Sequence, residues 1–158
     1  MTARDSEADG LQPPHSRSAC AIRSWRNLLD AHHVAVRREL ARFRGNEVKS
    51  LGDGFLATFD GPARAIRCAS AITEAVRPLG IEVRTGLHTG EVELSEDDVR
   101  GIAVHVASRV ASLAGPSEVL VSRTVKDLVA GSGIRFVERG RHPLHGLQEP
   151  VELYSASN

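Results

Sequence analysis

Two short extended runs around a Gly-Asp-Gly tripeptide restrict the fold of this chain more than any other feature. Residues 48–51 and 55–59 carry apolar side chains and flank Gly52, Asp53 and Gly54. An Asp-Gly pair between extended runs is a strong hairpin signal, because the tight turn needs positive φ. The turn holds the carboxylate of Asp53 out from the backbone and its glycines let a ligand approach, which suits a metal or phosphate site. An ordinary hairpin turn is the alternative interpretation of Asp53.

Helical and extended periodicities alternate along the rest of the chain. Apolar residues at three- and four-residue steps predict a helix that begins at Ser24 and is stopped by Gly45, and a second helix follows Asp60. Downstream we expect an acidic loop at 95–98, strands at 81–87, 91–94, 118–122, 135–139 and 151–154, and helices at 101–113 and 124–130. This order predicts an α/β (α+β) class, with a mixed, mainly antiparallel sheet and helices packed on it.

Composition and charge exclude several classes of protein. The 158 residues contain 20 Lys and Arg against 20 Asp and Glu, so the basic excess of a nucleic-acid-binding protein is absent. No apolar run is long enough to span a bilayer, and the start of the chain is not a signal peptide. We therefore expect a cytoplasmic protein that binds neither nucleic acid nor membrane. Its predicted organisation is a disordered tail over residues 1–22 and one folded domain over residues 23–158.

Further polar residues lie at spacings that suit binding. His105 and Arg109 are one turn apart, so on a helix they share a face, and an Arg beside a donor suits a phosphate clamp. A surface Arg on an amphipathic helix is the alternative. Lys49 lies four residues before Asp53, and a solvated Lys on a strand is the alternative there. His145 lies beside a turn with one other histidine and no third metal ligand in view.

Five segments together resemble the class III adenylate and guanylate cyclases, with the character of the actinobacterial members. They occur in the family's order and spacing at residues 47–59, 84–92, 98–109, 115–122 and 139–154. The resemblance implies a ferredoxin-like nucleotide cyclase fold with active sites in a head-to-tail dimer interface. The partner would be a second copy, giving a homodimer, or another cyclase domain, giving a heterodimer. It further implies two Mg or Mn ions and the conversion of ATP into cyclic AMP and pyrophosphate.

The resemblance also implies roles for individual residues. Asp53 matches the second metal-binding aspartate of the family. Lys49 matches the residue that reads the adenine ring and Asp98 its partner on the purine edge, which together form the ATP-type pair. Arg109 matches the arginine that stabilises charge on the reacting phosphate. His105 stands beside it where most of the family has Asn, and it retains a hydrogen-bond donor.

Two further departures concern the metal and the triphosphate. The family's first metal aspartate lies on an N-terminal strand with the pattern Phe-x-Asp-Ile-x-Gly, and no such pattern precedes Ser24, where the acids are Asp5, Glu7 and Asp9. We interpret this as a missing N-terminal strand, which leaves one metal ligand and an extra sheet edge that would recruit a partner. His145 occupies the position of a phosphate-binding Lys, and neutral His is a weaker partner for a triphosphate.

These departures leave two functions open. The first is an adenylate cyclase with little or no activity in the chain as it stands, because losing one stabilising group commonly slows catalysis ~10²–10³-fold. The second is a degenerate cyclase domain that binds nucleotide, dimerises, or regulates a complete cyclase as an interaction module.

Overall fold

The computed structural model describes residues 1–5, 19–52, 54–95, 98–144 and 147–157. These residues form strands and helices in alternation along the chain. In chain order the elements are β1 (Thr2–Asp5), α1 (Ala19–Arg42), β2 (Asn46–Leu51), β3 (Gly54–Thr58), α2 (Pro62–Val76), the 3₁₀-helix η1 (Arg77–Leu79), β4 (Val83–Leu87), β5 (Glu93–Ser95), β6 (Asp98–Arg100), α3 (Ile102–Leu113), β7 (Val119–Ser122), α4 (Arg123–Leu128), β8 (Arg135–His142) and β9 (Val151–Ser157).

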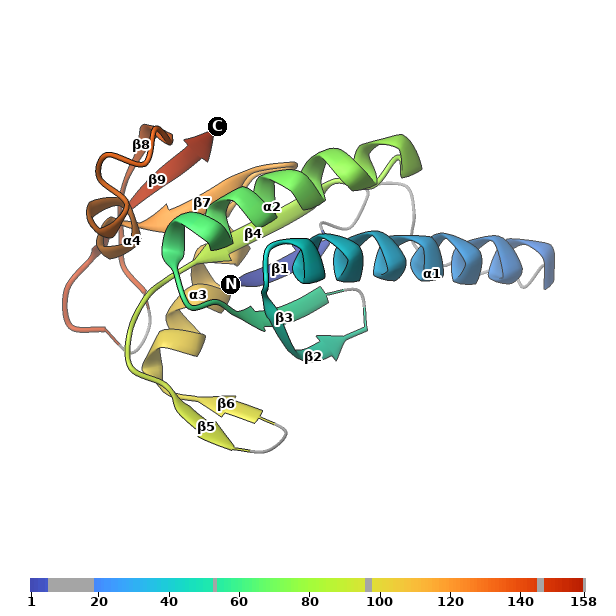
Figure 1. Cartoon of the computed structure of the whole chain (residues 1–158), viewed down its shortest axis with the longest axis horizontal. Helices are drawn as coiled ribbons and strands as arrows, with labels where there is room; N and C mark the ends of the chain where they lie inside the picture. The colour runs from blue at the N-terminus through green and yellow to red at the C-terminus, as the bar shows by residue number, and fades with distance from the viewer. Residues whose placement is uncertain (6–18, 53, 96–97, 145–146, 158) are drawn as a thin grey trace.

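A seven-stranded sheet forms the middle of the molecule (Figure 1). Its strand order is β2-β3-β1-β4-β7-β9-β8, and β5 pairs with β6 in a separate two-stranded hairpin. All neighbours in the large sheet are antiparallel except β4 and β7, which are parallel. The predicted fold class, a mixed and mainly antiparallel sheet with helices packed on it, is confirmed.

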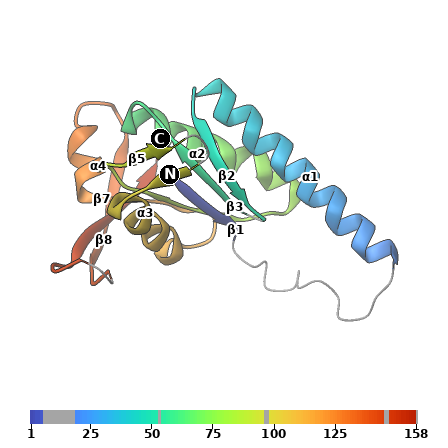
Figure 2. The same ribbon diagram turned by 90° about the horizontal axis from the view of Figure 1, so that it is seen from below.

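Helices cover both faces of this sheet. Val83 and Leu87 of β4 belong to the buried cluster that contains the apolar face of α2, and α1 packs beside α2. Gly86, between them, faces α3 on the opposite side, where a Cβ atom would overlap the backbone of Ala107 and Ala111. Figure 2 shows the same arrangement, with α1 and α2 on one side of the sheet and α3 on the other.

Strand β1 lies in the centre of the sheet, between β3 and β4. It is antiparallel to both neighbours, and its last residue, Asp5, lies opposite Val83 of β4. Met1 extends the pairing with β3 by one residue: its amino group donates to the carbonyl oxygen of Ala57 at 2.8 Å, and the Ala57 N–H donates to the Met1 carbonyl at 3.0 Å. The buried side chain of Met1 joins the core cluster beneath α1 and α2. The N-terminal strand is therefore anchored by backbone pairing on both sides.

This strand corrects the expectation of a strandless tail over residues 1–22. Thr2–Asp5 form β1 and α1 begins at Ala19, ahead of the predicted start at Ser24, while residues 6–18 lie outside the described residues. Four residues are too few to show a readable alternation of apolar and polar side chains. Backbone groups on both neighbours satisfy such a strand whatever its side chains are. β1 occupies the sheet edge that a missing strand would have exposed. An exposed edge is therefore no longer a reason to expect association with a partner.

The other predicted elements agree more closely with the structure. The Gly-Asp-Gly hairpin is confirmed, with Ser50 opposite Phe55 and a register irregularity between Glu47 and Lys49. The acidic loop expected at residues 95–98 is partly wrong, because Asp98–Arg100 form β6. Strand β8 extends further than expected, to His142. A bulge near Glu138 interrupts the alternation of side chains in β8. The end of the strand was predicted where that alternation stops.

The close contact between β4 and α3 leads to a prediction about the effect of a substitution at Gly86 on stability. We expect Gly86→Ala to lower the free energy of unfolding by at least about 2 kcal/mol, because the helix backbone cannot move away from the added methyl group without disturbing the core. Urea unfolding followed by circular dichroism measures this change. Gly61→Ala is the matched control, since a Cβ there meets nothing within 4 Å, and it should cost less than about 1 kcal/mol. Equal losses in the two variants would contradict the packing described for β4.

Candidate functional site

Helix α1 holds the β2–β3 hairpin from one side. The Arg37 guanidinium donates to both carboxylate oxygens of Glu47, with Nε–Oε2 at 2.8 Å and Nη2–Oε1 at 3.0 Å. His33 Nε2 lies 3.0 Å from the carbonyl oxygen of Gly52, the residue before Asp53. Together these contacts tie the start of β2 and the turn of the hairpin to one helix. Helix α1 therefore holds β2 at Glu47 and the hairpin backbone at Gly52.

Aromatic packing strengthens this attachment. The ring of Phe55 in β3 lies edge-on to His32 and His33, with centroid distances of 5.9 and 5.0 Å. Arg37 sits over the same ring, with its guanidinium carbon 5.7 Å from the centroid. Hydrogen bonding to Arg37 lowers the pKa of Glu47, so the pair stays ionised at neutral pH. An ion pair this exposed contributes at most about 1 kcal/mol, so the buried Phe55 is the main anchor.

The two residues expected to read a purine lie on neighbouring elements. Lys49 is a half-buried residue of β2, opposite Leu56 of β3. Asp98 is the first residue of β6, and its backbone pairs with Ser95 of β5. Strand β2 contacts β6, so the fold brings the segments that carry Lys49 and Asp98 together although they are far apart in sequence.

Helix α3 carries the two predicted catalytic residues beside β6. His105 is exposed and Arg109, one turn later, is half-buried. The helix begins after Gly101, whose φ of 135° is open to glycine alone among common residues, and packs against β4 and β6. The structure thus places the predicted pair on α3, on the face of the sheet opposite α1 and α2.

Two predicted site residues, Asp53 and His145, lie outside the described residues. On either side of Asp53, β2 ends at Leu51 and β3 starts at Gly54. Because β1 is antiparallel to β3, Asp5 ends β1 at the end of the sheet where β3 begins. Carboxylates from these two places would supply the hard oxygen donors that Mg and Mn prefer. In the described part of the chain, no three His, Cys, Asp or Glu residues cluster as a ready metal site.

His88, in the segment that follows β4, has a structural role. Its Nδ1 lies 2.8 Å from the hydroxyl oxygen of Ser122 at the end of β7. Burial, and then the positive charge of the nearby Met1 amino group, lower the pKa of His88, so the ring is neutral at pH 7.

Comparison with known proteins identifies the family. The family model described as "Adenylate and Guanylate cyclase catalytic domain" matches residues 15–158. This chain belongs to that family. The resemblance drawn from the hairpin and from the α3 motif is therefore confirmed at the level of the family.

Relatives in sequence include cyclases and proteins without an assigned activity. A putative adenylate cyclase of Rhizobium meliloti is 30% identical over 123 residues, which covers 72% of this chain and 21% of that protein. An uncharacterised protein of Mycobacterium tuberculosis is 37% identical over 103 residues, which covers 63% of this chain and 35% of that protein. The chain thus spans about a fifth to a third of the length of these relatives.

Solved structures share the fold. An adenylate/guanylate cyclase/hydrolase from Silicibacter pomeroyi superposes with a TM-score of 0.82 at 24% identity, covering 99% of this chain and 95% of that one. The catalytic core of a rhodopsin-guanylyl cyclase with converted specificity, in complex with ATPαS, gives 0.84 at 18% identity, covering 99% and 92%. In the described part of this chain, no helix is both long and apolar enough to cross a bilayer.

Sequence reasoning missed the residues that position the hairpin. Nothing in the pattern singled out Arg37 and Glu47, which are ten residues apart across a turn and read as ordinary surface charges. His33 was missed as well, because its partner is the backbone carbonyl of Gly52 and no side-chain pattern reveals such a contact. The only sequence signal for such positioning residues is that polar side chains lie on a helix that immediately precedes the functional hairpin.

Proposed function

We propose that this chain is an adenylate cyclase domain that converts ATP into cyclic AMP and pyrophosphate at a dimer interface. The observation that carries the proposal is the central strand β1. Its last residue, Asp5, lies at the end of the sheet where β3 begins, one residue after Asp53. Asp5 is thus the candidate for the first metal aspartate that the sequence pattern did not reveal.

The proposed metal ligands are Asp5 and Asp53 of one subunit. Divalent Mg or Mn bound there would neutralise charge on the attacking and leaving oxygens. The role of the chain's own residues is to hold the two carboxylates at adjacent strand ends. The contacts from α1 to Glu47, Gly52 and Phe55 support this arrangement by restricting the hairpin.

The proposed purine and phosphate contacts come from β2, β6 and α3 of the second subunit. Lys49 donates to a ring nitrogen of adenine and Asp98 accepts from the exocyclic amine. Arg109 stabilises charge on the α-phosphate while the ribose 3′-oxygen bonds to phosphorus and the bond to pyrophosphate breaks. His105 donates a hydrogen bond beside Arg109. Since these groups only position and neutralise, the chemistry remains that of the nucleotide itself.

The assignment of the carboxylates is tested by cyclase activity with Mn²⁺ and ATP. We expect the whole chain to form cyclic AMP. Asp53→Asn and Asp5→Asn should each lower the rate by ~10²–10³-fold, because each removes one charged group from the reacting centre. Asp9→Asn is the matched control, a second upstream aspartate that should retain most of the activity.

Each outcome of this assay has a definite meaning. Loss of activity in Asp9→Asn, but not in Asp5→Asn, would show that the first metal ligand is misassigned and that the cyclase reaction is correct. A folded wild-type chain that makes no cyclic AMP would overturn the catalytic proposal. Altered activity of a complete cyclase on mixing with that inactive chain would then establish the regulatory module instead.

Nucleotide choice gives a second prediction, made at Lys49. Guanine presents a carbonyl oxygen where adenine has its amine, so Asp98 would face an acceptor and stay unpaired. Calorimetry should show ATP binding about tenfold or more tighter than GTP, and Lys49→Glu should shift the preference towards GTP. Lys126→Glu is the matched control, because Lys126 is the other lysine of the chain and lies on α4. Equal affinities for ATP and GTP in the wild type would contradict the purine-reading pair.

A further inference from the structure

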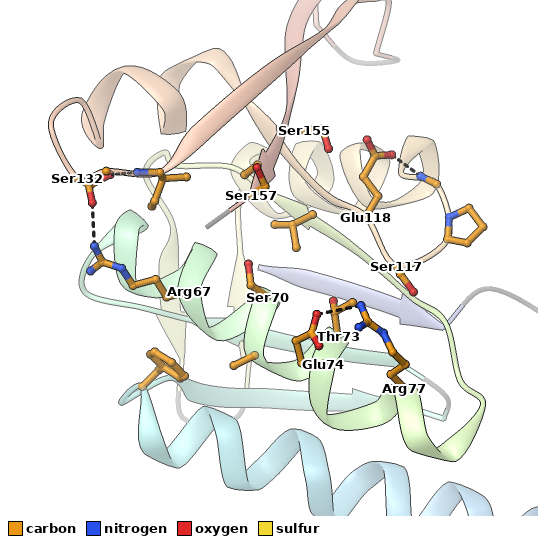
Figure 3. Close-up of a pocket in the computed structure, with 18 of the residues that line it drawn as sticks. Arg67, Ser70, Thr73, Glu74, Arg77, Ser117, Glu118, Ser132, Ser155 and Ser157 are labelled. Carbon is orange, nitrogen blue, oxygen red and sulfur yellow. Dashed lines mark hydrogen bonds and ion pairs between the residues drawn. The ribbon is translucent and has the colours of Figure 1, made fainter.

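A polar trough lies beside α2. It has a volume of about 970 Å³ and runs between α2, the turn before β7 and the C-terminal end of β9. Figure 3 shows side chains from these elements pointing into it. The predicted residues Lys49, His105 and Arg109 are not among those that line it. We call this cavity the α2 trough.

One wall of the α2 trough is a single face of α2 and η1. Arg67, Ser70, Glu74 and Arg77 recur at steps of three and four residues, the spacing that places side chains on one side of a helix. Arg67 and Arg77 are ten residues apart, which corresponds to about 15 Å along the helix axis. Figure 3 shows them towards opposite ends of the trough. Each end therefore has its own guanidinium group.

Hydroxyl groups line the opposite wall. Ser117 precedes β7, Ser132 follows α4, and Ser155 and Ser157 belong to β9. Ser117 adopts a positive φ of 56°, uncommon for a residue other than glycine. The wall thus offers groups that both donate and accept hydrogen bonds, which suits a ligand rich in hydroxyls.

The charge of the α2 trough favours an anion. Its lining contains four arginines and two glutamates, a formal excess of two positive charges. Glu118 is held by Arg139, with Nε–Oε1 at 3.0 Å, and by the N–H of Gly115, and Arg42 pairs with Glu39. The Glu118 carboxylate is therefore neutralised within the fold.

Arg67 and Arg77 remain available to a ligand. Arg67 donates to the neutral carbonyl oxygen of Ser132 at 3.0 Å, and within the described ranges no carboxylate pairs with it. Arg77 pairs with Glu74 at 2.9 Å, but both side chains are 65% exposed, and ion pairs of this kind contribute little. Arg77 could therefore release Glu74 and bind a ligand anion with little loss of free energy.

We propose that the α2 trough binds a small hydroxylated organic phosphate. Its volume falls in the range of small-molecule sites, and arginine is the side chain best matched to phosphate oxygens. The phosphate lies against Arg67, and the hydroxyls of the ligand bond to the serine wall. The site is separate from the nucleotide site, since α3 lies on the opposite face of the sheet.

Ribose 5-phosphate is the probe that tests this proposal, with ribose and inorganic phosphate as its parts. Added to the ¹⁵N-labelled chain at millimolar concentrations, it should shift the amide signals of Ser70, Arg77, Ser132 and Ser155, and it should bind more tightly than either part. Arg67→Ala should weaken binding about tenfold, the effect of one charge-assisted contact. Arg64→Ala is the matched control, an arginine of α2 that pairs with Asp60 outside the trough.

The readouts separate the possible outcomes. Arg67 is exposed, so its variant should keep the wild-type circular dichroism and unfolding midpoint. No shift with ribose 5-phosphate or phosphate would overturn the proposal, as would equal binding by Arg67→Ala and Arg64→Ala. Loss of binding in Arg109→Ala with retention in Arg67→Ala would place the phosphate at the nucleotide site and also overturn it. None of these results depends on cyclase activity.

Discussion

Backbone pairing of β1 with β3 and β4 is the interaction on which the rest of the structure depends. Without it the sheet would be divided between the β2–β3 hairpin and the β4-β7-β9-β8 half, because no other strand among the described residues joins them. The two hydrogen bonds between Met1 and Ala57 and the pairing of Asp5 with Val83 connect the two halves. The same strand brings an upstream aspartate to the end of the sheet where the functional hairpin begins.

The two faces of the sheet have different roles. On one face, α1 fixes the hairpin through Arg37, His33 and the ring of Phe55, and α2 borders the arginine-rich trough. On the other, α3 carries His105 and Arg109 and packs so closely on Gly86 that no side chain fits between them. The site residues act by their position and not by their own reactivity. Rigid attachment of the helices to both faces of the sheet suits such a site.

Most of the fold could be predicted from the sequence, because turn residues and local apolar periodicity determine most of its helices and strands. The hairpin at Asp53 follows from turn chemistry, and α2 and α3 follow from apolar periodicity. β1 could not be predicted, since its stability comes from partners far along the chain. Residue types and spacing pointed to Lys49, Asp98, His105 and Arg109 through the family resemblance. The contacts of His33 and Arg37 depend on tertiary packing that no local pattern records.

Residues Thr2–Asp5 form the middle strand of the sheet. Amide hydrogen exchange followed by NMR tests it most directly. We expect slow exchange at Ala3, Arg4 and Asp5, comparable with the amides of β4 and β7, and cross-strand proton contacts between Ala3 and Phe55. Exchange of the β1 amides at the rate of an unstructured chain, with β4 and β7 still protected, would contradict it.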